Sequence, residues 1–130
     1  MGKILSKADI FSKKGLTART VSVPEWGGDV RYRPMSMSER REIRKRSTEI
    51  ITKNGSTDVQ VDSELMEVYT VITCVLDPKD DAKLMFGPDD LEILESQMSA
   101  GGISTIAQAV LRDSGMGGEA AFRGEEDDRE

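Results

Sequence analysis

The sequence contains no histidine and only one cysteine. Without imidazole, the chain lacks the usual general base of Ser-His and Cys-His catalytic pairs and the most common nitrogen ligand of zinc. Cys74 has no partner for a disulfide within the chain and lies in the apolar run 71–76, so we expect a small buried side chain in a reducing compartment. The composition predicts a non-enzymatic protein with no catalytic residue, no cofactor and no metal site.

Long apolar runs are also missing, since no stretch approaches the roughly 18 apolar residues of a membrane-spanning helix. Residues 1–14 carry charges where a signal peptide has its apolar centre. We therefore expect a soluble cytosolic protein that does not bind membranes.

Asp77, Asp80 and Asp81 lack the central glycine and the terminal glutamate of a calcium-binding loop.

The net charge of −6 conceals two halves of opposite sign. Residues 1–60 contain 13 Lys and Arg against 7 Asp and Glu, a net charge of +6, whereas residues 61–130 contain 5 against 17, a net charge of −12. Such asymmetry is typical either of a nucleic-acid face with an acidic tail or of two surfaces that attract each other within or between subunits. The overall acidity favours the second interpretation, and head-to-tail association of copies would produce a spiral or a ring.

Hydrophobic periodicity and turn signals predict a mainly α fold. We expect one compact helical domain over residues 1–115, with four to five helices and a small N-terminal β-hairpin at about 20–34, followed by a flexible, disordered acidic tail at 116–130. The first expected helix is short and covers residues 6–14. The next begins at the Ser36–Glu39 capping box, runs to Lys53 and stops at Asn54-Gly55, and a polar loop follows at 56–61. We then expect a core helix at 64–76, a helix that opens at 86–90, a break at 99–102 and a last helix at 103–114.

A basic run over residues 40–46 has three interpretations. Glutamates at four-residue spacing are typical of an ordinary solvated helix face, while the positive charge also suits docking to an acidic partner, including another copy. Nucleic-acid binding is the third, although no aromatic side chain alternates with the basic residues. The candidate contacts are Arg40, Arg41, Arg44 and Arg46, with Asp89, Asp90, Glu92 and Glu95 of a neighbouring copy, or an equivalent surface of the client, as their counterpart.

Two aromatic residues of the hairpin are further candidates for contacts with another protein. Trp26 is either half-buried against the helices or an interface anchor, and Tyr32 is a candidate for a contact along the hairpin edge. Met66, Met85 and Met98 are either fillers of the core or part of a groove that accepts a helix.

The order of these parts resembles the tail assembly chaperones of long-tailed, siphovirus-type bacteriophages and prophages. The resemblance rests on a short helix near 8–11, the hairpin segment Thr20-Val-Ser-Val-Pro-Glu-Trp-Gly-Gly-Asp-Val30, the helix start Met35-Ser-Met-Ser-Glu-Arg40 and the closing segment 106–115, which ends in Ser-Gly. It spans about residues 5 to 116. None of these motifs is catalytic.

The resemblance implies a protein of the host cytoplasm that binds and solubilises the tape measure protein and helps to recruit tail tube subunits. Members of this family self-associate, some are also made as a longer frameshifted form that contacts the tube protein, and they are absent from the mature virion. The alternatives are a structural tail or adaptor protein that stays in the virion, and a small nucleic-acid-binding regulator that uses the basic helix.

Overall fold

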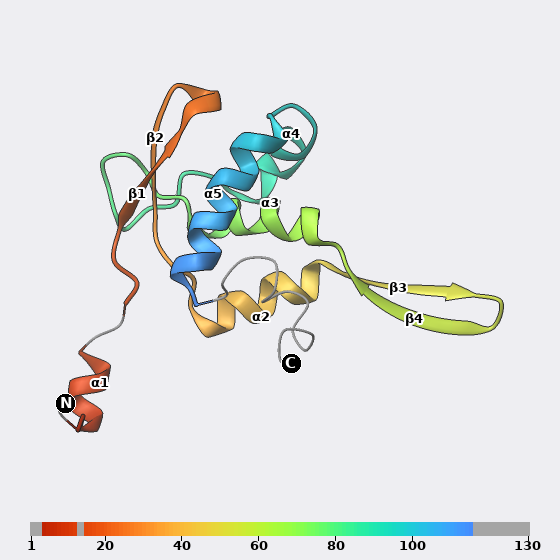
Figure 1. The fold of residues 1–130 in the computed structure, drawn as a ribbon, viewed down its shortest axis with the longest axis horizontal. Coiled ribbons are helices and arrows are strands. Elements are labelled where there is room, and N and C mark those ends of the chain that lie inside the picture. Colours follow the sequence, from red (N-terminus) through yellow and green to blue (C-terminus); the bar gives the residue numbers. More distant parts are fainter. Residues whose placement is uncertain (1–3, 13–14, 116–130) are drawn as a thin grey trace, which may run out of the picture.

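A computed structural model of the chain describes residues 4–12 and 15–115, so the acidic tail predicted at 116–130 lies outside the described residues. Within the described part, 48% of the residues are helical and 23% lie in strands, which form two separate two-stranded antiparallel sheets. The mainly α prediction is therefore wrong, and the fold is mixed α/β. The elements follow the order α1 (Lys7–Phe11), β1 (Arg19–Val23), η1 (Pro24–Trp26), β2 (Gly28–Tyr32), α2 (Met37–Arg46), β3 (Thr48–Lys53), β4 (Ser56–Val61), α3 (Ser63–Cys74), η2 (Pro88–Asp90), α4 (Leu91–Ser96) and α5 (Ala100–Asp113) (Figure 1).

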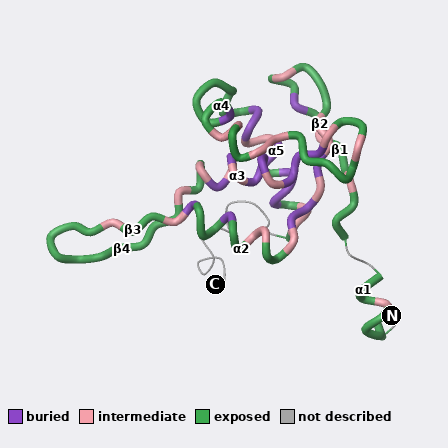
Figure 2. The backbone as a smooth tube through the Cα atoms, turned by 180° about the vertical axis from the view of Figure 1, so that it is seen from behind, coloured by how far each residue is buried: buried purple, intermediate pink, exposed green. Residues whose placement is uncertain are grey.

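Helices α3 and α5 pack against each other and form the centre of the core, where Figure 2 shows most of the buried residues. The Asp62 carboxylate caps α3 by accepting a hydrogen bond from the Leu65 amide at 3.0 Å. Val71 of α3 and Ile106 of α5 have no exposed surface. The helical spacing of apolar residues in both segments is the physical reason that they bury one face against each other.

The β1–β2 hairpin lies alongside α5, near the position that the sequence predicts (Figure 1). Val21 pairs with Val30, and the connection turns at Gly27, whose φ of 76° is in the left-handed region that favours glycine. The other edge of β2 pairs with the chain after α3, where the Leu76 amide donates a hydrogen bond to the Arg31 carbonyl at 2.8 Å. The first hairpin is therefore anchored to the chain that leaves α3.

The second hairpin, β3–β4, corrects the prediction of a helix to Lys53 and of a loop at 56–61. Helix α2 ends at Arg46, and the next two hydroxyl groups donate to its last carbonyls, Ser47 to Ile43 at 2.8 Å and Thr48 to Arg44 at 2.6 Å. The residues that follow are rich in β-branched side chains, which favour strands. Asn54-Gly55 then closes a two-residue hairpin turn, with φ values of 55° and 82°, rather than terminating a helix.

The break that the sequence predicts at 99–102 lies instead at 97–99, because α4 ends at Ser96 and residues 100–102 already form the first turn of α5. The Ser99 hydroxyl caps this helix by accepting a hydrogen bond from the Gly102 amide at 3.2 Å. Gly102 lies within the first turn, and a Cβ atom built on it would lie 2.4 Å from the Trp26 indole nitrogen. Glycine is therefore used here for close packing rather than to stop a helix.

Candidate protein-binding surface

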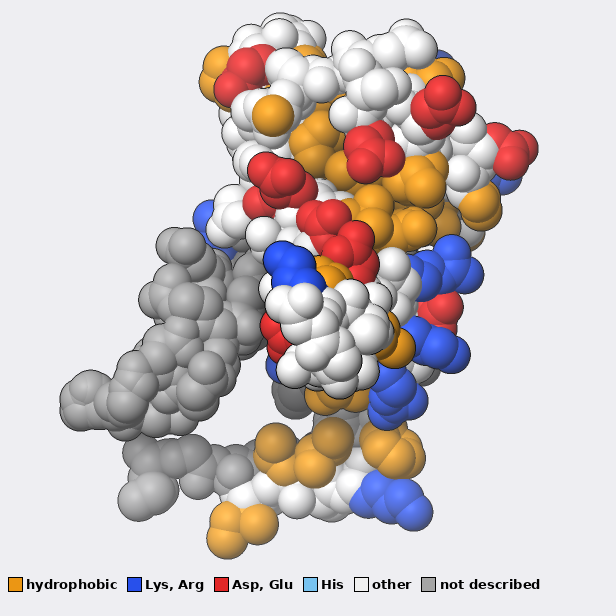
Figure 3. Space-filling view, turned by 90° about the vertical axis from the view of Figure 1, so that its right-hand side faces the viewer, with side chains coloured by type: hydrophobic (Ala, Val, Ile, Leu, Met, Phe, Trp, Pro, Cys, Tyr) orange, Lys and Arg blue, Asp and Glu red, His pale blue; other side chains and the backbone are white. Residues whose placement is uncertain are grey.

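Two neighbouring apolar clefts, of about 310 and 230 Å³, both include Phe86 in their lining, and we refer to the pair as the groove. The first lies between α2, α3 and the segment that leads to α4, and the second lies between the first hairpin, that segment and α4. Figure 3 shows hydrophobic side chains gathered on one face of the body, with carboxylates around them and lysines and arginines along one side. The first cleft is lined by Glu39, Glu42, Ile43, Arg46, Tyr69, Ile72, Thr73, Leu84, Phe86, Pro88 and Leu91, and the second by Trp26, Val30, Met85, Phe86, Asp90, Ile93, Leu94 and Met98.

The wall that α2 contributes is held by ionic contacts. Arg33 donates two hydrogen bonds to the Glu39 carboxylate, at 2.9 and 2.8 Å, and a third to the Thr73 carbonyl at 3.3 Å. Burial raises the pKa of Glu39, but the hydrogen bonds from Arg33 and from the Ser36 amide outweigh it, so the net effect lowers the pKa. The predicted capping box, in which Ser36 and Glu39 exchange hydrogen bonds, is confirmed.

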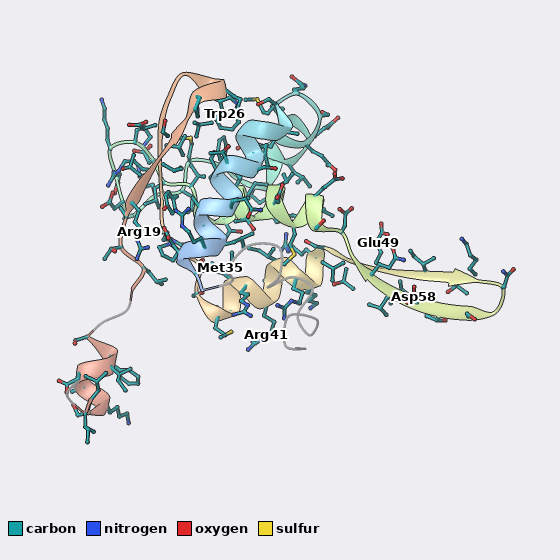
Figure 4. All side chains as sticks on the ribbon, viewed as in Figure 1. Arg19, Trp26, Met35, Arg41, Glu49 and Asp58 are labelled. Atoms are coloured by element: carbon teal, nitrogen blue, oxygen red, sulfur yellow. The ribbon has the colours of Figure 1, made fainter. Side chains whose placement is uncertain are left out.

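Arg46 is the one predicted basic contact that lines the groove. Its guanidinium donates to Glu42 at 2.8 Å and lies 5.9 Å from the centre of the Tyr69 ring. The structure describes no ion pair for Arg40, Arg41 or Arg44. Arg41 lies on the outer side of α2 in Figure 4, away from the core.

The predicted acidic counterparts lie on η2 and α4, across the groove from α2. Asp90 lines the second cleft, where its carboxylate accepts the Gly87 amide at 2.9 Å. Asp89 and Glu92 are exposed, and Glu95 lines a third cleft of about 390 Å³ between α3, α4 and α5, which has Leu94 and Met98 in common with the second. No described ion pair joins the basic and acidic candidates within this chain.

The two aromatic candidates differ in their surroundings. Trp26 lies at the tip of the first hairpin, half-buried against α5, and its indole N–H donates to the Ser99 hydroxyl at 3.2 Å (Figure 4). Tyr32 is only 2% exposed, and its hydroxyl donates to Asp113, which also pairs with Arg19 at 3.1 Å. Tyr32 is therefore a core residue rather than a contact on the hairpin edge, because β2 is covered there by the chain that leaves α3.

The three methionines divide between the core and the groove. Met66 is 2% exposed and belongs to the core, whereas Met85 and Met98 are 41% and 37% exposed and line the second cleft. The interpretation of all three as core fillers is therefore wrong for Met85 and Met98.

The β3–β4 hairpin is a surface that the sequence analysis missed. One of its faces consists entirely of uncharged β-branched residues, and it includes Ile50, Val59 and Val61, which are 71%, 61% and 47% exposed. In Figure 4, Glu49 and Asp58 lie along this projecting hairpin. The signal that could have revealed it is Asn54-Gly55 between two β-branched segments, which is typical of a tight hairpin.

The chemistry of the described residues is limited. Burial raises the pKa of the Cys74 thiol to about 12, so this side chain is a poor nucleophile in the folded protein. Among the described residues, no group of three or more acidic or cysteine side chains is placed to hold a metal ion, and no helix is long and apolar enough to span a membrane.

The chain matches no protein-family model, no curated protein and no solved structure.

Proposed function

We propose that the protein is a tail assembly chaperone of a long-tailed bacteriophage or prophage. In this proposal it works in the host cytoplasm, binds and solubilises the tape measure protein, helps to recruit tail tube subunits and leaves before the virion is complete. Copies of the chain associate around the client, and a longer frameshifted form contacts the tube protein. The observation that carries the proposal is the pair of neighbouring apolar clefts on a chain whose sequence resembles this family.

The groove suits an amphipathic helix, which inserts apolar side chains three, four and seven residues apart into a hydrophobic surface. The two clefts, which both have Phe86 in their lining, provide two positions for such side chains. Met85 and Met98 add flexible thioethers, which adapt to different partner shapes. The groove therefore has the properties required to cover a long helical client without a strict sequence preference.

The rim of the groove contributes orientation more than affinity. Glu42 and Arg46 of α2 line the first cleft, and Asp90 lines the second. Charges at the edge of an interface mainly affect the association rate and the exclusion of wrong partners. We therefore expect the apolar side chains to supply most of the binding free energy.

The test is co-expression with the tape measure protein of the same phage. We expect the wild-type chain to increase the soluble fraction of the client and Met85→Glu to lose this effect, because a carboxylate would enter the second cleft. Met37→Glu is the matched control, since Met37 is 66% exposed on α2 and lines neither cleft.

Three outcomes would contradict parts of this proposal. A client that stays insoluble with the wild-type chain rejects the chaperone function. Equal effects of the two methionine variants reject the groove as the binding site. Detection of the chain in purified mature particles by mass spectrometry favours a structural tail protein.

A further inference from the structure

The segment 4–11, which includes helix α1, carries apolar side chains that are largely exposed. Ile4, Leu5, Ile10 and Phe11 are 95%, 47%, 52% and 63% exposed. Figures 1 and 2 show α1 separated from the body, and the lowest part of Figure 3, which is α1, presents mainly hydrophobic side chains.

The short helix is held by a capping box. The Ser6 hydroxyl accepts the Asp9 amide at 3.1 Å, and the Asp9 carboxylate accepts the Ser6 amide at 3.0 Å. Isolated helices of this length are marginal in water, and an uncovered apolar face adds to that problem. A surface that buries these side chains would stabilise the helix.

The segment that contains α1 is positively charged. Residues 1–15 include Lys3, Lys7, Lys13 and Lys14 against the single carboxylate of Asp9, a net charge of +3 from the side chains. Its partner should therefore combine an apolar floor with negative charge.

A cleft with these properties lies at the junction of α3, α4 and α5, and we refer to it as the acidic cleft. Its volume is about 390 Å³, and no lysine or arginine lines it. Four carboxylates surround an apolar floor; the full lining is Asp62, Glu64, Leu65, Glu67, Val68, Leu94, Glu95, Met98, Ala100, Ile103 and Ser104.

The carboxylates of the acidic cleft lack cationic partners within the described chain. The Glu67 carboxylate accepts hydrogen bonds from the Ser104 hydroxyl at 2.7 Å and from the side-chain amide of Gln108 at 3.1 Å. Both donors are neutral groups. Glu64 and Glu95 are exposed, and neither forms a described ion pair. An uncompensated cluster of this kind attracts a cationic segment.

We propose that α1 of one copy docks in the acidic cleft of a second copy. The apolar side chains of α1 lie on the cleft floor, and lysines beside them face the carboxylates. The occupant is a second copy because α1 and the α3–α4 junction lie on opposite sides of the molecule (Figure 1), while residues 12–18 extend only about 25 Å.

An arm that docks in a cleft of the next copy is a heterologous contact, so each copy offers one arm and one cleft. Repetition of such contacts produces a ring or an open spiral. This inference deepens the proposed function and rests on the self-association that it includes. In this inference the cationic partner of the acidic surface is the N-terminal arm, residues 1–15, and not the basic face of α2.

The test uses two variants of the full chain, each defective in one half of the contact. Ile10→Asp with Phe11→Asp removes the apolar face of the arm, and Glu64→Lys with Glu95→Lys reverses two charges of the cleft. Met37→Asp is the control at an exposed apolar site outside the cleft. Circular dichroism checks that each variant keeps its helical signal.

We expect wild type and the control to form oligomers in light scattering after size exclusion, and each defective variant alone to be monomeric or at least tenfold weaker in association. An equimolar mixture of the two defective variants should form a dimer with one copy of each, because one intact arm and one intact cleft remain. Association should weaken with added salt, since part of it is electrostatic.

A monomeric wild-type chain overturns the inference. In that case α1 docks within its own copy or on a different protein, and not on a second copy. A mixture without the dimer, or arm variants that assemble like wild type, overturns it as well. The co-expression test above is independent. Loss of the dimer with continued solubilisation of the client removes only this contact, whereas assembly without solubilisation removes the proposed function.

Discussion

Replacing Gly102 with alanine is expected to displace Trp26 from α5 and to destabilise the protein. A Cβ atom at this position would lie 2.4 Å from the indole Nε1, 2.5 Å from Cε2 and 2.8 Å from Cζ2. The indole is a rigid ring, and its N–H donates to Ser99 one turn away. The ring must therefore move as a unit, and the hydrogen bond to the helix cap is strained or lost.

The expected magnitude combines two opposing effects. Overpacking of a well-packed site costs about 1–3 kcal/mol, whereas alanine in place of glycine favours a helix by up to about 1 kcal/mol. With a helix gain of about 1 kcal/mol, the net loss is about 0–2 kcal/mol in the free energy of unfolding. For a domain of this size, 1 kcal/mol corresponds to roughly 4 °C, so the melting temperature should fall by up to about 8 °C.

Gly101→Ala is the matched control at the neighbouring position. Its Cβ atom would lie 2.5 Å from Oε2 of Glu25, which is the far end of a flexible and exposed side chain. That carboxylate can swing into solvent, so this variant should be neutral or slightly more stable than wild type.

Two measurements check the comparison. Chemical unfolding reports the free energy, and intrinsic fluorescence reports the environment of Trp26, the single tryptophan of the chain. We expect a shifted emission maximum in Gly102→Ala and an unchanged one in Gly101→Ala. Equal stabilities and equal spectra for the two variants would refute the close packing of the first hairpin on α5.

Three further predictions follow from other parts of the molecule. A pKa of about 12 should slow the reaction of Cys74 with a thiol reagent at pH 8 on the order of 10³-fold relative to the unfolded chain, and a rate equal to that of a free thiol would contradict its burial. The hydrogen bond from Tyr32 lowers the pKa of Asp113, so its stabilisation is present above the ordinary value of 3.8 and is lost as the pH falls through the folded value. Asp113→Asn should therefore flatten the acid side of the stability profile below about pH 4 in urea titrations, and a slope equal to that of wild type would exclude this role. Gly55→Ala places a side chain at a φ of 82° and should destabilise the β3–β4 turn by about 1 kcal/mol, which amide exchange would detect as faster exchange in β3 and β4, whereas Gly28→Ala, with open space around it, should leave β3 and β4 unchanged.

The sequence predicts local structure correctly where a few neighbouring residues decide the conformation. The capping box at Ser36 and the burial of Cys74 both lie where the sequence predicts them. The same local approach was wrong at Asn54-Gly55, because this dipeptide suits both a helix end and a hairpin turn. The hydroxyls of Ser47 and Thr48, which bond back to α2, settle the choice for the hairpin.

The groove and the acidic cleft could be predicted only in part. Sequence reasoning named Trp26 and Glu95, which line them, but it also named Tyr32, which the chain after α3 covers. The sequence does not indicate Phe86, which lines both clefts of the groove, because no local pattern shows which side of that residue stays uncovered.

By itself, the sequence determined the kind of chemistry and most of the element starts: no imidazole, a lone buried thiol, opposite charges in the two halves, and caps whose hydrogen bonds span three residues. Only the tertiary structure decided which surfaces stay uncovered. Trp26 meets Ser99, and Glu67 meets Ser104 and Gln108, across long stretches of chain. Such contacts depend on how α3, α5 and the first hairpin pack together, and the clefts are the spaces that this packing leaves at the surface.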